Sequence, residues 1–237
     1  MDWLQCLGRH LEFRPHGLAE WKTAFALKTM GMTSASVREL LIASWLKVRN
    51  KKGRLVRLRP NRAQQAFEAR CTERNIILKA RQMGMTTWIA ARFFVHTITQ
   101  PGTLSVQVAH DQRSAEEIFR IVHRFLDNLP ETVRRGALNP SRVNVRQIVF
   151  PRLDSEYRVE TAADPNAGRG LTIQNLHCSE VARWPRDGAE TLASLRAAVP
   201  PGGQVVLEQK FRDGLSKVID GTVQCLNASI WGPAAVK

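Results

Sequence analysis

The sequence is short of acidic residues and cysteines, and it contains no long apolar run. Apolar runs such as residues 40–46 are much shorter than the roughly 18 residues that a membrane-spanning helix needs, so no membrane span is expected. Asp2 and Arg9 interrupt the order of basic and then apolar residues that a secretion signal requires. The four cysteines lie far apart, at Cys6, Cys71, Cys178 and Cys225. Without a C-x-x-C spacing they predict reduced thiols in a cytoplasmic protein, and they argue against a zinc site.

The length and composition are those of a folded α/β protein. The chain has 237 residues, of which 43% are hydrophobic and 24% charged, and these proportions exclude wholesale disorder. A chain of this length accommodates one large domain with a small N-terminal addition.

Positive charge is in excess and is unevenly distributed. Lysine and arginine number 35 against 21 acidic residues, which gives a formal net charge of +14. Residues 47–62 carry eight basic side chains and no acidic one. We interpret this stretch as a nucleic-acid contact, because phosphates attract clustered lysine and arginine. The alternative is a solvated, positively charged linker or ribbon.

Hydrophobic periodicity predicts alternating strands and helices after a helical N-terminal segment over residues 1–46. Helices are expected over residues 62–71, 86–99 and 189–199, and a further helix is expected to follow a cap at Asp111. Strands are expected over residues 75–79, 103–109, 142–150, 157–161, 171–178 and 204–208. This alternation predicts a mostly parallel sheet with helices on both faces.

The most informative segment is the polar loop between the expected strand at 75–79 and the helix that follows it. Loop amides and a helix N-terminus can bind a phosphate chain. Compared with the pattern G-x-x-x-x-G-K-[ST], Lys79 stands at the first glycine and Met85 at the lysine, while Gly84 and Thr86 match. A lysine at the strand end could still reach the β- and γ-phosphates, and Thr86 could bind Mg²⁺. The alternative is an ordinary turn with Thr86 as the helix cap.

A second segment supports the nucleotide interpretation. The apolar run at 171–178 ends in Ser179 and Glu180. A carboxylate at the carboxyl end of a strand, beside a phosphate loop, can polarise the attacking water. Alone, Glu180 would be taken for a solvated surface residue, but together with Lys79 and Thr86 it favours a nucleotide hydrolase.

The order of motifs resembles the ATPase half of a tailed-phage terminase large subunit over residues 60–208. The motifs are NxxQ at 61–64, KARQMGMTT at 79–87, VAHDxxxAEEIF at 108–119, GRG at 168–170 and HCSEVARWP at 177–185. Members of this family with the lysine at the front of the loop are familiar. The resemblance implies an additional-strand, RecA-like P-loop NTPase fold. It also implies an ATP- and Mg²⁺-dependent motor that moves double-stranded DNA into a capsid in the bacterial host cytoplasm.

The resemblance also assigns roles to single residues. Lys79 would bind the β- and γ-phosphates, Thr86 would hold Mg²⁺, Glu180 would position the attacking water and Gln64 would contact adenine. The remaining loop residues would lie against the nucleotide: Ala80, Arg81, Gln82, Met83, Gly84, Met85 and Thr87. Arg169 is a candidate for the arginine that stabilises transition-state charge, and its alternative is an exposed residue in a glycine-bounded turn. The implied partners are a terminase small subunit, a portal protein and further copies of the chain in a ring.

Two departures from the family pattern stand out. Ser179 occupies the position of the usual metal-binding aspartate, so Mg²⁺ would be held by Thr86 and Ser179 with phosphate and water. Glu208 is followed by Gln209 and Lys210, where the family carries Glu-Ser-Thr or similar. Residues 209–237 leave no room for the nuclease domain of the family, so we expect a truncated reading frame. The expected organisation is a helical segment with a basic linker (1–59), an ATPase domain (60–208) and a tail (209–237).

The sequence is also compatible with other functions. One is a prophage remnant that binds DNA and at most nucleotide, without hydrolysis. Another is a helicase or a small-molecule kinase of P-loop type. Helicases carry a fuller Asp-Glu pair in place of Ser179-Glu180, and a small-molecule kinase has little use for a charge of +14.

Overall fold

The computed structural model describes residues 34–210, except 81, 135–137, 139, 141, 145, 165 and 186–187. Several expectations therefore lie outside the described residues: the helical periodicity before residue 34, the tail from residue 211 and the loop residue Arg81. Within the described ranges, no helix is long and apolar enough to cross a bilayer.

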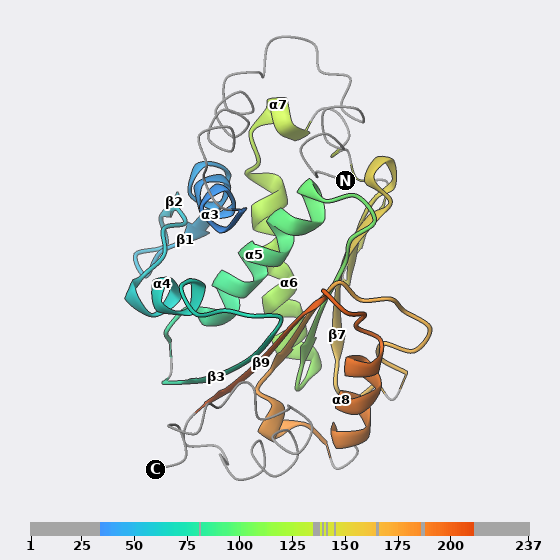
Figure 1. Ribbon diagram of the computed structural model, residues 1–237. Coiled ribbons are helices and arrows are strands. Elements are labelled where there is room, and N and C mark those ends of the chain that lie inside the picture. The colour runs from blue at the N-terminus through green and yellow to red at the C-terminus, as the bar shows by residue number, and fades with distance from the viewer. Residues whose placement is uncertain are drawn as a thin grey trace.

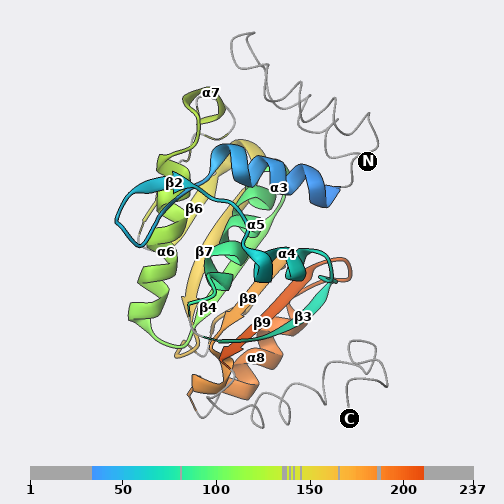
Figure 2. The same cartoon turned by 90° about the vertical axis from the view of Figure 1, so that its left-hand side faces the viewer.

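The centre of the molecule is a seven-stranded sheet with the order β3-β9-β8-β4-β7-β6-β5 (Figures 1 and 2). The first five strands run parallel, and β6 and β5 extend the sheet in antiparallel fashion. The strands are β3 (Arg74–Lys79), β4 (Leu104–Ala109), β5 (Arg142–Val143), β6 (Gln147–Phe150), β7 (Ser155–Thr161), β8 (Asn175–Ser179) and β9 (Gln204–Lys210). Strand β9 is the additional strand, because it lies between β3, which leads into the loop, and β8, which ends at Ser179-Glu180.

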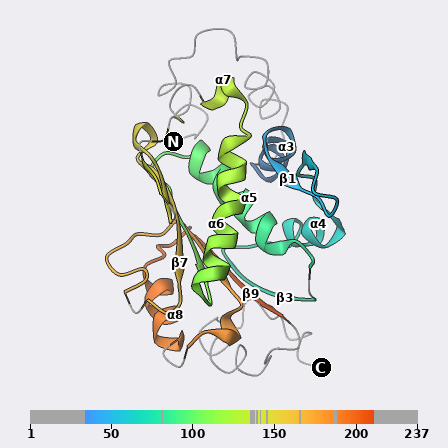
Figure 3. The same cartoon turned by 180° about the vertical axis from the view of Figure 1, so that it is seen from behind.

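Helices cover both faces of the sheet, as the strand–helix alternation predicts. Figure 1 views the sheet nearly edge-on, with α5 and α6 on one side and α8 on the other, and Figure 3 shows α6 in front of α5 from behind. The longer helices are α3 (Ser34–Trp45), α4 (Arg62–Glu68), α5 (Met85–Thr99), α6 (Gln112–Asp127) and α8 (Gly188–Ala197). The short ones are α7 (Glu131–Arg134), η2 (Pro151–Leu153) and η3 (Val181–Arg183). The predicted α/β class is therefore confirmed.

Two apolar clusters, one on each face, hold these layers together. The larger includes buried side chains of α3, α5 and α6, such as Trp45, Trp88 and Phe125. The smaller joins α8 to the other face through residues such as Leu195 and Leu207. Each cluster needs side chains from several elements, so the helices on either face stabilise the sheet between them by burying its apolar surface.

The start and the buried face of helix α6 follow from its own residues. The Asp111 side chain accepts a hydrogen bond from the Ser114 amide at 2.7 Å, which satisfies a free backbone donor at the helix start. The apolar residues that recur at helical spacing along this helix are buried: Ala115, Ile118, Phe119, Val122, Phe125 and Leu126. The cap is the one expected from the sequence, and the apolar face follows the 3.6-residue period of a helix.

The basic stretch forms an antiparallel ribbon. Strands β1 (Lys47–Arg49) and β2 (Leu55–Arg57) pair directly, and Leu55 and Val56 are exposed together with the basic side chains around them. The Asn50 side chain accepts hydrogen bonds from the amides of Lys52 and Arg54, both at 3.0 Å, and this closes the turn. We call residues 47–57 the basic hairpin.

A buried ionic cluster connects α3, α4 and α5. The Glu68 carboxylate on α4 pairs with Arg92 on α5 and lies 3.6 Å from Arg38 on α3. It also accepts a hydrogen bond from Trp88 Nε1 at 2.8 Å. Arg92 and Glu68 are almost completely buried, so each charge depends on the other for compensation.

Two predicted strand boundaries are wrong. The strand expected over residues 142–150 is a hairpin of β5 and β6, because the Asn144 side chain accepts a bond from the Arg146 amide at 2.9 Å and turns the chain. The strand expected from residue 171 begins only at Asn175. Before it, the Ile173 amide donates to the carbonyl of Ala198 at the end of α8, and this removes it from the sheet ladder.

Candidate functional site

Lys79 and Thr86, predicted from the two ends of the loop, both contact the carboxylate of Glu208. The Lys79 ammonium forms an ion pair with Glu208 Oε1. The Thr86 hydroxyl lies 2.8 Å from Oε1 and 3.1 Å from Oε2 of the same carboxylate. Glu208 is completely buried, and the Lys79 side chain is only 9% exposed. The structure thus brings the two loop residues together around an acid that has no assigned role in the sequence-based prediction.

Strand register explains this convergence. Strands β3 and β9 pair in parallel with Ile77 opposite Glu208, so Lys79, two residues after Ile77, lies on the same face as Glu208. Thr86 is the second residue of α5, and α5 starts directly above this face. The carboxyl ends of parallel strands meet at one edge of the sheet, where α/β folds place their ligand sites.

The backbone of the loop has a strained conformation. Gly84 caps α5 with φ +68°, and Gln82 has φ +59°, a left-handed value that side-chain-bearing residues rarely adopt. Gly84 suits its position for a second reason, since a Cβ there would come within 3.0 Å of the Gln64 side chain. Ala80 and Gln82 are exposed, Met83 is half-buried, Met85 is buried and Thr87 lies in the first turn of α5.

Helix α4 holds this loop from the side. Gln64 Nε2 donates to the Gly84 carbonyl at 2.8 Å, and Asn61 Nδ2 donates to the Met83 carbonyl at 3.0 Å. The same two side chains form the capping box of α4, in which each binds the other's backbone amide. Gln64, predicted to contact adenine, is therefore seen to anchor the loop, and its side chain is buried.

A row of buried polar side chains continues from Glu208 across the sheet. Glu208 Oε2 lies 2.9 Å from His177 Nε2, and His177 Nδ1 lies 2.5 Å from Gln107 Nε2. The Tyr157 hydroxyl donates to Gln107 Oε1 at 2.6 Å. Because the Gln107 amide must then donate to Nδ1, His177 carries its hydrogen on Nε2 and donates it to Glu208. Strands β9, β8, β4 and β7 thus contribute one side chain each.

The contacts of Glu208 also fix its charge. Burial alone would raise the pKa of this carboxyl, but the contacts with His177 and Lys79 outweigh it and lower the pKa to about 2. Glu208 is therefore an ionised carboxylate at neutral pH, enclosed by donors.

Glu180 lies at the same edge, directly after β8, in an unusual conformation. Its φ of 53° and ψ of 46° are left-handed, and the residue is buried. Its Oε2 lies 3.2 Å from Lys210 Nζ. A left-handed glutamate costs of order 1 kcal/mol and re-aims the side chain out of the line of the strand. Strained residues of this kind cluster at functional sites.

The neighbours of Glu180 support this turn. Ser179 is buried opposite Glu208 in the ladder, and its carbonyl accepts a bond from Trp184 Nε1 at 3.0 Å. Gln209 Oε1 accepts a bond from the Ala182 amide at 2.7 Å, which ties η3 to β9. Gln209, a departure from the family pattern in the sequence, thus supports the segment that follows Glu180.

Arg169 lies in an exposed turn after β7. Its guanidinium donates to Asn166 Oδ1 at 3.2 Å, and among the contacts of the described residues none connects it with Lys79, Thr86 or Glu180. The preceding Gly168 has φ +80° and packs so closely on Leu195 of α8 that a Cβ would lie 2.6 Å away. Gly170 also has a left-handed φ, +69°, so both bounding glycines have a structural reason of their own.

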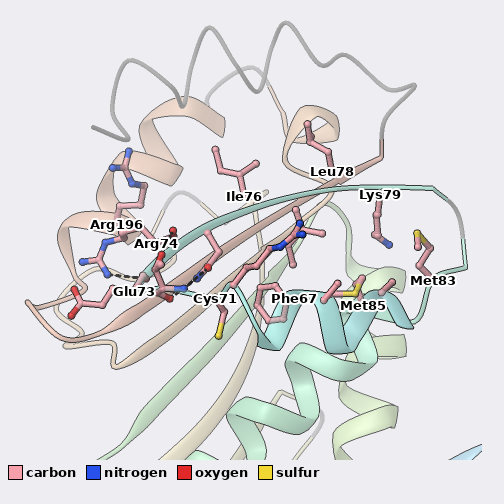
Figure 4. Close-up of a pocket in the computed structure, with 16 residues that line it drawn as sticks. Phe67, Cys71, Glu73, Arg74, Ile76, Leu78, Lys79, Met83, Met85 and Arg196 are labelled. Atoms are coloured by element: carbon pink, nitrogen blue, oxygen red, sulfur yellow. Dashed lines mark hydrogen bonds between the residues drawn. The ribbon is translucent and has the colours of Figure 1, made fainter. Parts of the chain in front are cut away.

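A groove of about 1010 Å³ runs along β3 beneath α4 and ends at Lys79 (Figure 4). Figure 4 shows Lys79, Met83 and Met85 at one end of this groove and Arg74 and Arg196 at the other. Phe67 lines the wall between them. The groove thus joins the loop to a partly apolar surface that could hold a flat ring.

Across the described ranges, no group of three or more His, Cys, Asp or Glu side chains is placed to hold a metal ion. Mg²⁺ at a nucleotide site needs less, because one or two protein ligands are completed by phosphate oxygens and water. The Thr86 hydroxyl and the Glu208 carboxylate provide oxygen ligands of the required kind.

Sequence reasoning missed Glu208, His177 and the loop-anchoring role of Asn61. The signal for Glu208 was present as a lone acid directly after the apolar residues 205–207 of β9. The signal for Asn61 was the N-x-x-Q spacing of a capping box before a helix. His177 had no such signal, because its contacts depend on the pairing of three strands.

Comparison with known proteins gives structural matches only. No protein-family model and no curated protein matches the chain. The large terminase of bacteriophage HK97 superimposes with a TM-score of 0.65 and 17% identity, over 83% of this chain and 42% of the terminase. Weaker matches, each with a TM-score of 0.49, are the large terminase ATPase domain of Thermus phage P74-26 (19% identity, 64% of this chain and 65% of the domain) and S. cerevisiae dbp5 bound to gle1 and ip6 (12% identity, 81% and 49%).

The first of these matches carries the conclusion on fold. It spans most of this chain and less than half of the terminase, so it bears on one part of that larger protein. Together with the strand order, it confirms the fold expected from the sequence: the chain has a large-terminase-like fold, with a mostly parallel, RecA-like sheet that contains an additional strand.

Proposed function

We propose that this chain is an Mg²⁺-dependent ATP hydrolase of the DNA-packaging type. The observation that carries the proposal is the meeting of Lys79 and Thr86 at Glu208, with Glu180 at the end of the adjacent strand. Phosphoryl transfer uses a cation, a hydroxyl and a carboxylate as functional groups, and all three lie here at the carboxyl edge of a parallel sheet.

Each group has a role in binding. The phosphate chain lies along the loop 80–87, where the α5 N-terminus and the loop amides attract negative charge. Lys79 turns from Glu208 towards the β- and γ-phosphates, and Thr86 gives its hydroxyl to Mg²⁺. The ion, when bound, neutralises charge on the β- and γ-phosphates. The adenine lies farther along the groove, where Phe67 and the two methionines Met83 and Met85 supply apolar surface.

Glu180 performs the chemical role. Its carboxylate orients a water molecule for in-line attack on the γ-phosphorus and accepts a proton as the new bond forms. The bond between the γ-phosphorus and the bridging oxygen breaks, and ADP leaves with that oxygen. Arg169 is the candidate for transition-state charge, and because it is exposed it suits a site on a neighbouring copy of the chain.

The basic hairpin supplies a surface for the DNA backbone. Its side chains Arg49, Lys51, Lys52, Arg54 and Arg57 are exposed. Phosphate contacts of this kind give affinity without sequence preference. This matches a motor that moves any DNA sequence. By resemblance to large terminases, the remaining partners are a small subunit, a portal protein and a ring of identical chains.

The test is ATP hydrolysis by the purified chain with and without double-stranded DNA. We expect Mg²⁺-dependent turnover that DNA stimulates. Lys79→Ala should abolish it by weakening nucleotide binding, whereas Glu180→Ala should abolish turnover and keep binding. Arg120→Ala on the exposed face of α6 is the matched control and should leave both unchanged.

A second candidate function is a chain that binds DNA and nucleotide without hydrolysis. Ser179 in place of an acid favours this alternative. Bound nucleotide with no turnover in the wild-type chain would establish it, and equal turnover in Lys79→Ala and the wild type would remove the site assignment altogether.

A further inference from the structure

We propose that Glu208 is the carboxylate ligand of the nucleotide-bound Mg²⁺, acting with Thr86 in the role that Ser179 cannot fill. The proposal rests on the proposed function, since it concerns the metal of the same nucleotide site. It assigns a metal ligand to β9, whereas the resemblance suggested Thr86 and Ser179 alone.

The distance between the two oxygens suits a shared ion. Mg²⁺ binds oxygen at about 2.0–2.1 Å in octahedral geometry, so neighbouring ligands lie about 3 Å apart. Thr86 Oγ1 and Glu208 Oε1 are separated by 2.8 Å. The hydrogen bond between them can therefore be replaced by an ion that touches both, without movement of β9 or α5.

The second oxygen of Glu208 is already held. His177 Nε2 donates to Oε2 at 2.9 Å, and His177 is fixed in turn by Gln107 and Tyr157. Metal-binding carboxylates are typically oriented by such an outer hydrogen bond. Oε1 is the oxygen nearer to Thr86, and its other contact is the Lys79 ammonium, which the nucleotide phosphates would draw away.

The need to compensate the charge of Glu208 is an independent reason to place the metal ion there. Glu208 is completely buried, and Lys79 is the ammonium that pairs with it. If Lys79 turns to the phosphates of a nucleotide, the carboxylate loses a compensating charge in a site without solvent, which is costly. A divalent cation beside Thr86 restores that charge and joins Glu208 to the nucleotide.

The other acidic candidate is directed elsewhere. The Glu180 carboxylate, re-aimed by its left-handed backbone, pairs with Lys210. Ser179 lies opposite Glu208 in the ladder but offers only a short hydroxyl. Of the carboxylates in the described ranges, that of Glu208 is the one in contact with Thr86.

The experiment measures the affinity for a non-hydrolysable ATP analogue in EDTA and in Mg²⁺, and Mn²⁺ binding in the presence of the analogue by electron paramagnetic resonance. It compares the wild type with Glu208→Gln, Ser179→Ala and the double variant Ser179→Asp/Glu208→Gln. Glutamine keeps the volume of Glu208 and removes its charge. Ser179→Ala is the matched control on the neighbouring strand.

We expect Mg²⁺ to strengthen analogue binding in the wild type and in Ser179→Ala alike. In Glu208→Gln, Mn²⁺ affinity should fall at least about tenfold, the lower bound seen when even an indirect partner of a metal ligand is lost. Binding in EDTA should persist. The double variant should recover Mn²⁺ affinity, because it restores a carboxylate one strand away.

The results that would overturn the assignment of Glu208 differ from those that would overturn the proposed function. Unchanged Mn²⁺ affinity in Glu208→Gln, or its loss in Ser179→Ala, would overturn the assignment of Glu208 while leaving nucleotide binding intact. The Ser179→Ala result decides this even if Glu208→Gln does not fold. Absence of analogue binding in the wild type would instead overturn the proposed function itself.

Discussion

Lys79 and Lys210 are neighbours across β3 and β9, yet each pairs with a different carboxylate: Lys79 with Glu208 and Lys210 with Glu180. Two ion pairs thus stand side by side at the carboxyl edge of the sheet. This arrangement separates the acid that contacts Lys79 and Thr86 from Glu180, to which we assign the attacking water. Substitutions of the two lysines should therefore have different kinetic effects.

For Lys210→Met we expect kcat for ATP hydrolysis to fall about 10- to 100-fold while KM stays unchanged. Without its partner at 3.2 Å, the Glu180 carboxylate loses the contact that positions it. Steady-state kinetics check this, with Lys52→Met on the basic hairpin as control in the absence of DNA. A rise in KM without a fall in kcat would place Lys210 in nucleotide binding instead.

Gln64→Ala should weaken nucleotide binding and lower the free energy of unfolding by about 1 kcal/mol. The substitution removes half of the capping box and the bond to the Gly84 carbonyl, so both α4 and the loop lose an anchor. Chemical denaturation and calorimetric titration measure the two effects. Gln65→Ala, one residue along and exposed, should change neither; equal effects in both variants would show that helix propensity alone is responsible.

Tyr157→Phe should lower the free energy of unfolding by about 1–3 kcal/mol. The hydroxyl donates to Gln107 at 2.6 Å in a fully buried site, and its loss leaves the Gln107 acceptor without its bond. Burial raises the pKa of this phenol well above its usual value, so the hydroxyl stays protonated as a donor. Denaturant unfolding checks the value, and a change below about 0.5 kcal/mol, which is usual for surface substitutions, would contradict the donor role.

Combined replacement of Lys51, Lys52 and Arg54 by alanine should weaken DNA binding equally for all sequences. Each phosphate contact contributes about 0.9 to the slope of log K against log salt, so the slope should fall by about 3 if all three contact phosphate. Binding measured over a range of salt concentrations gives this slope. Arg113→Ala/Arg120→Ala on α6 removes exposed charge elsewhere, and an equal change there would indicate a general charge effect.

Local features were predictable because they depend on neighbours in the chain. Three features show this: the Asp111 cap, the apolar face of α6, and the strand–loop–helix around Lys79 and Thr86. Each of them depends on residues that are close to one another in the sequence. The alternation of strands and helices likewise predicts the parallel sheet with both faces covered.

The centre of the candidate site could not be predicted in this way. Glu208 meets Thr86 across 122 residues of sequence, and its contact with His177 needs the register of β8 and β9. The contact of Gln64 with the loop was also not predictable. Its motif indicated a contact with the nucleotide, and nothing in the sequence indicated the hydrogen bond to the Gly84 carbonyl. The hairpin at Asn144 was missed because a side chain that binds its own backbone can interrupt a β-rich run.

At Glu180, the left-handed backbone conformation favours a different residue from the one that the proposed hydrolysis needs. A glycine there would adopt φ +53° without steric cost, so the most easily folded sequence would carry no side chain at this position. The carboxylate is thus retained at the expense of local stability. An improvement in thermal tolerance sought at this turn would consequently remove the very group on which the proposed hydrolysis depends.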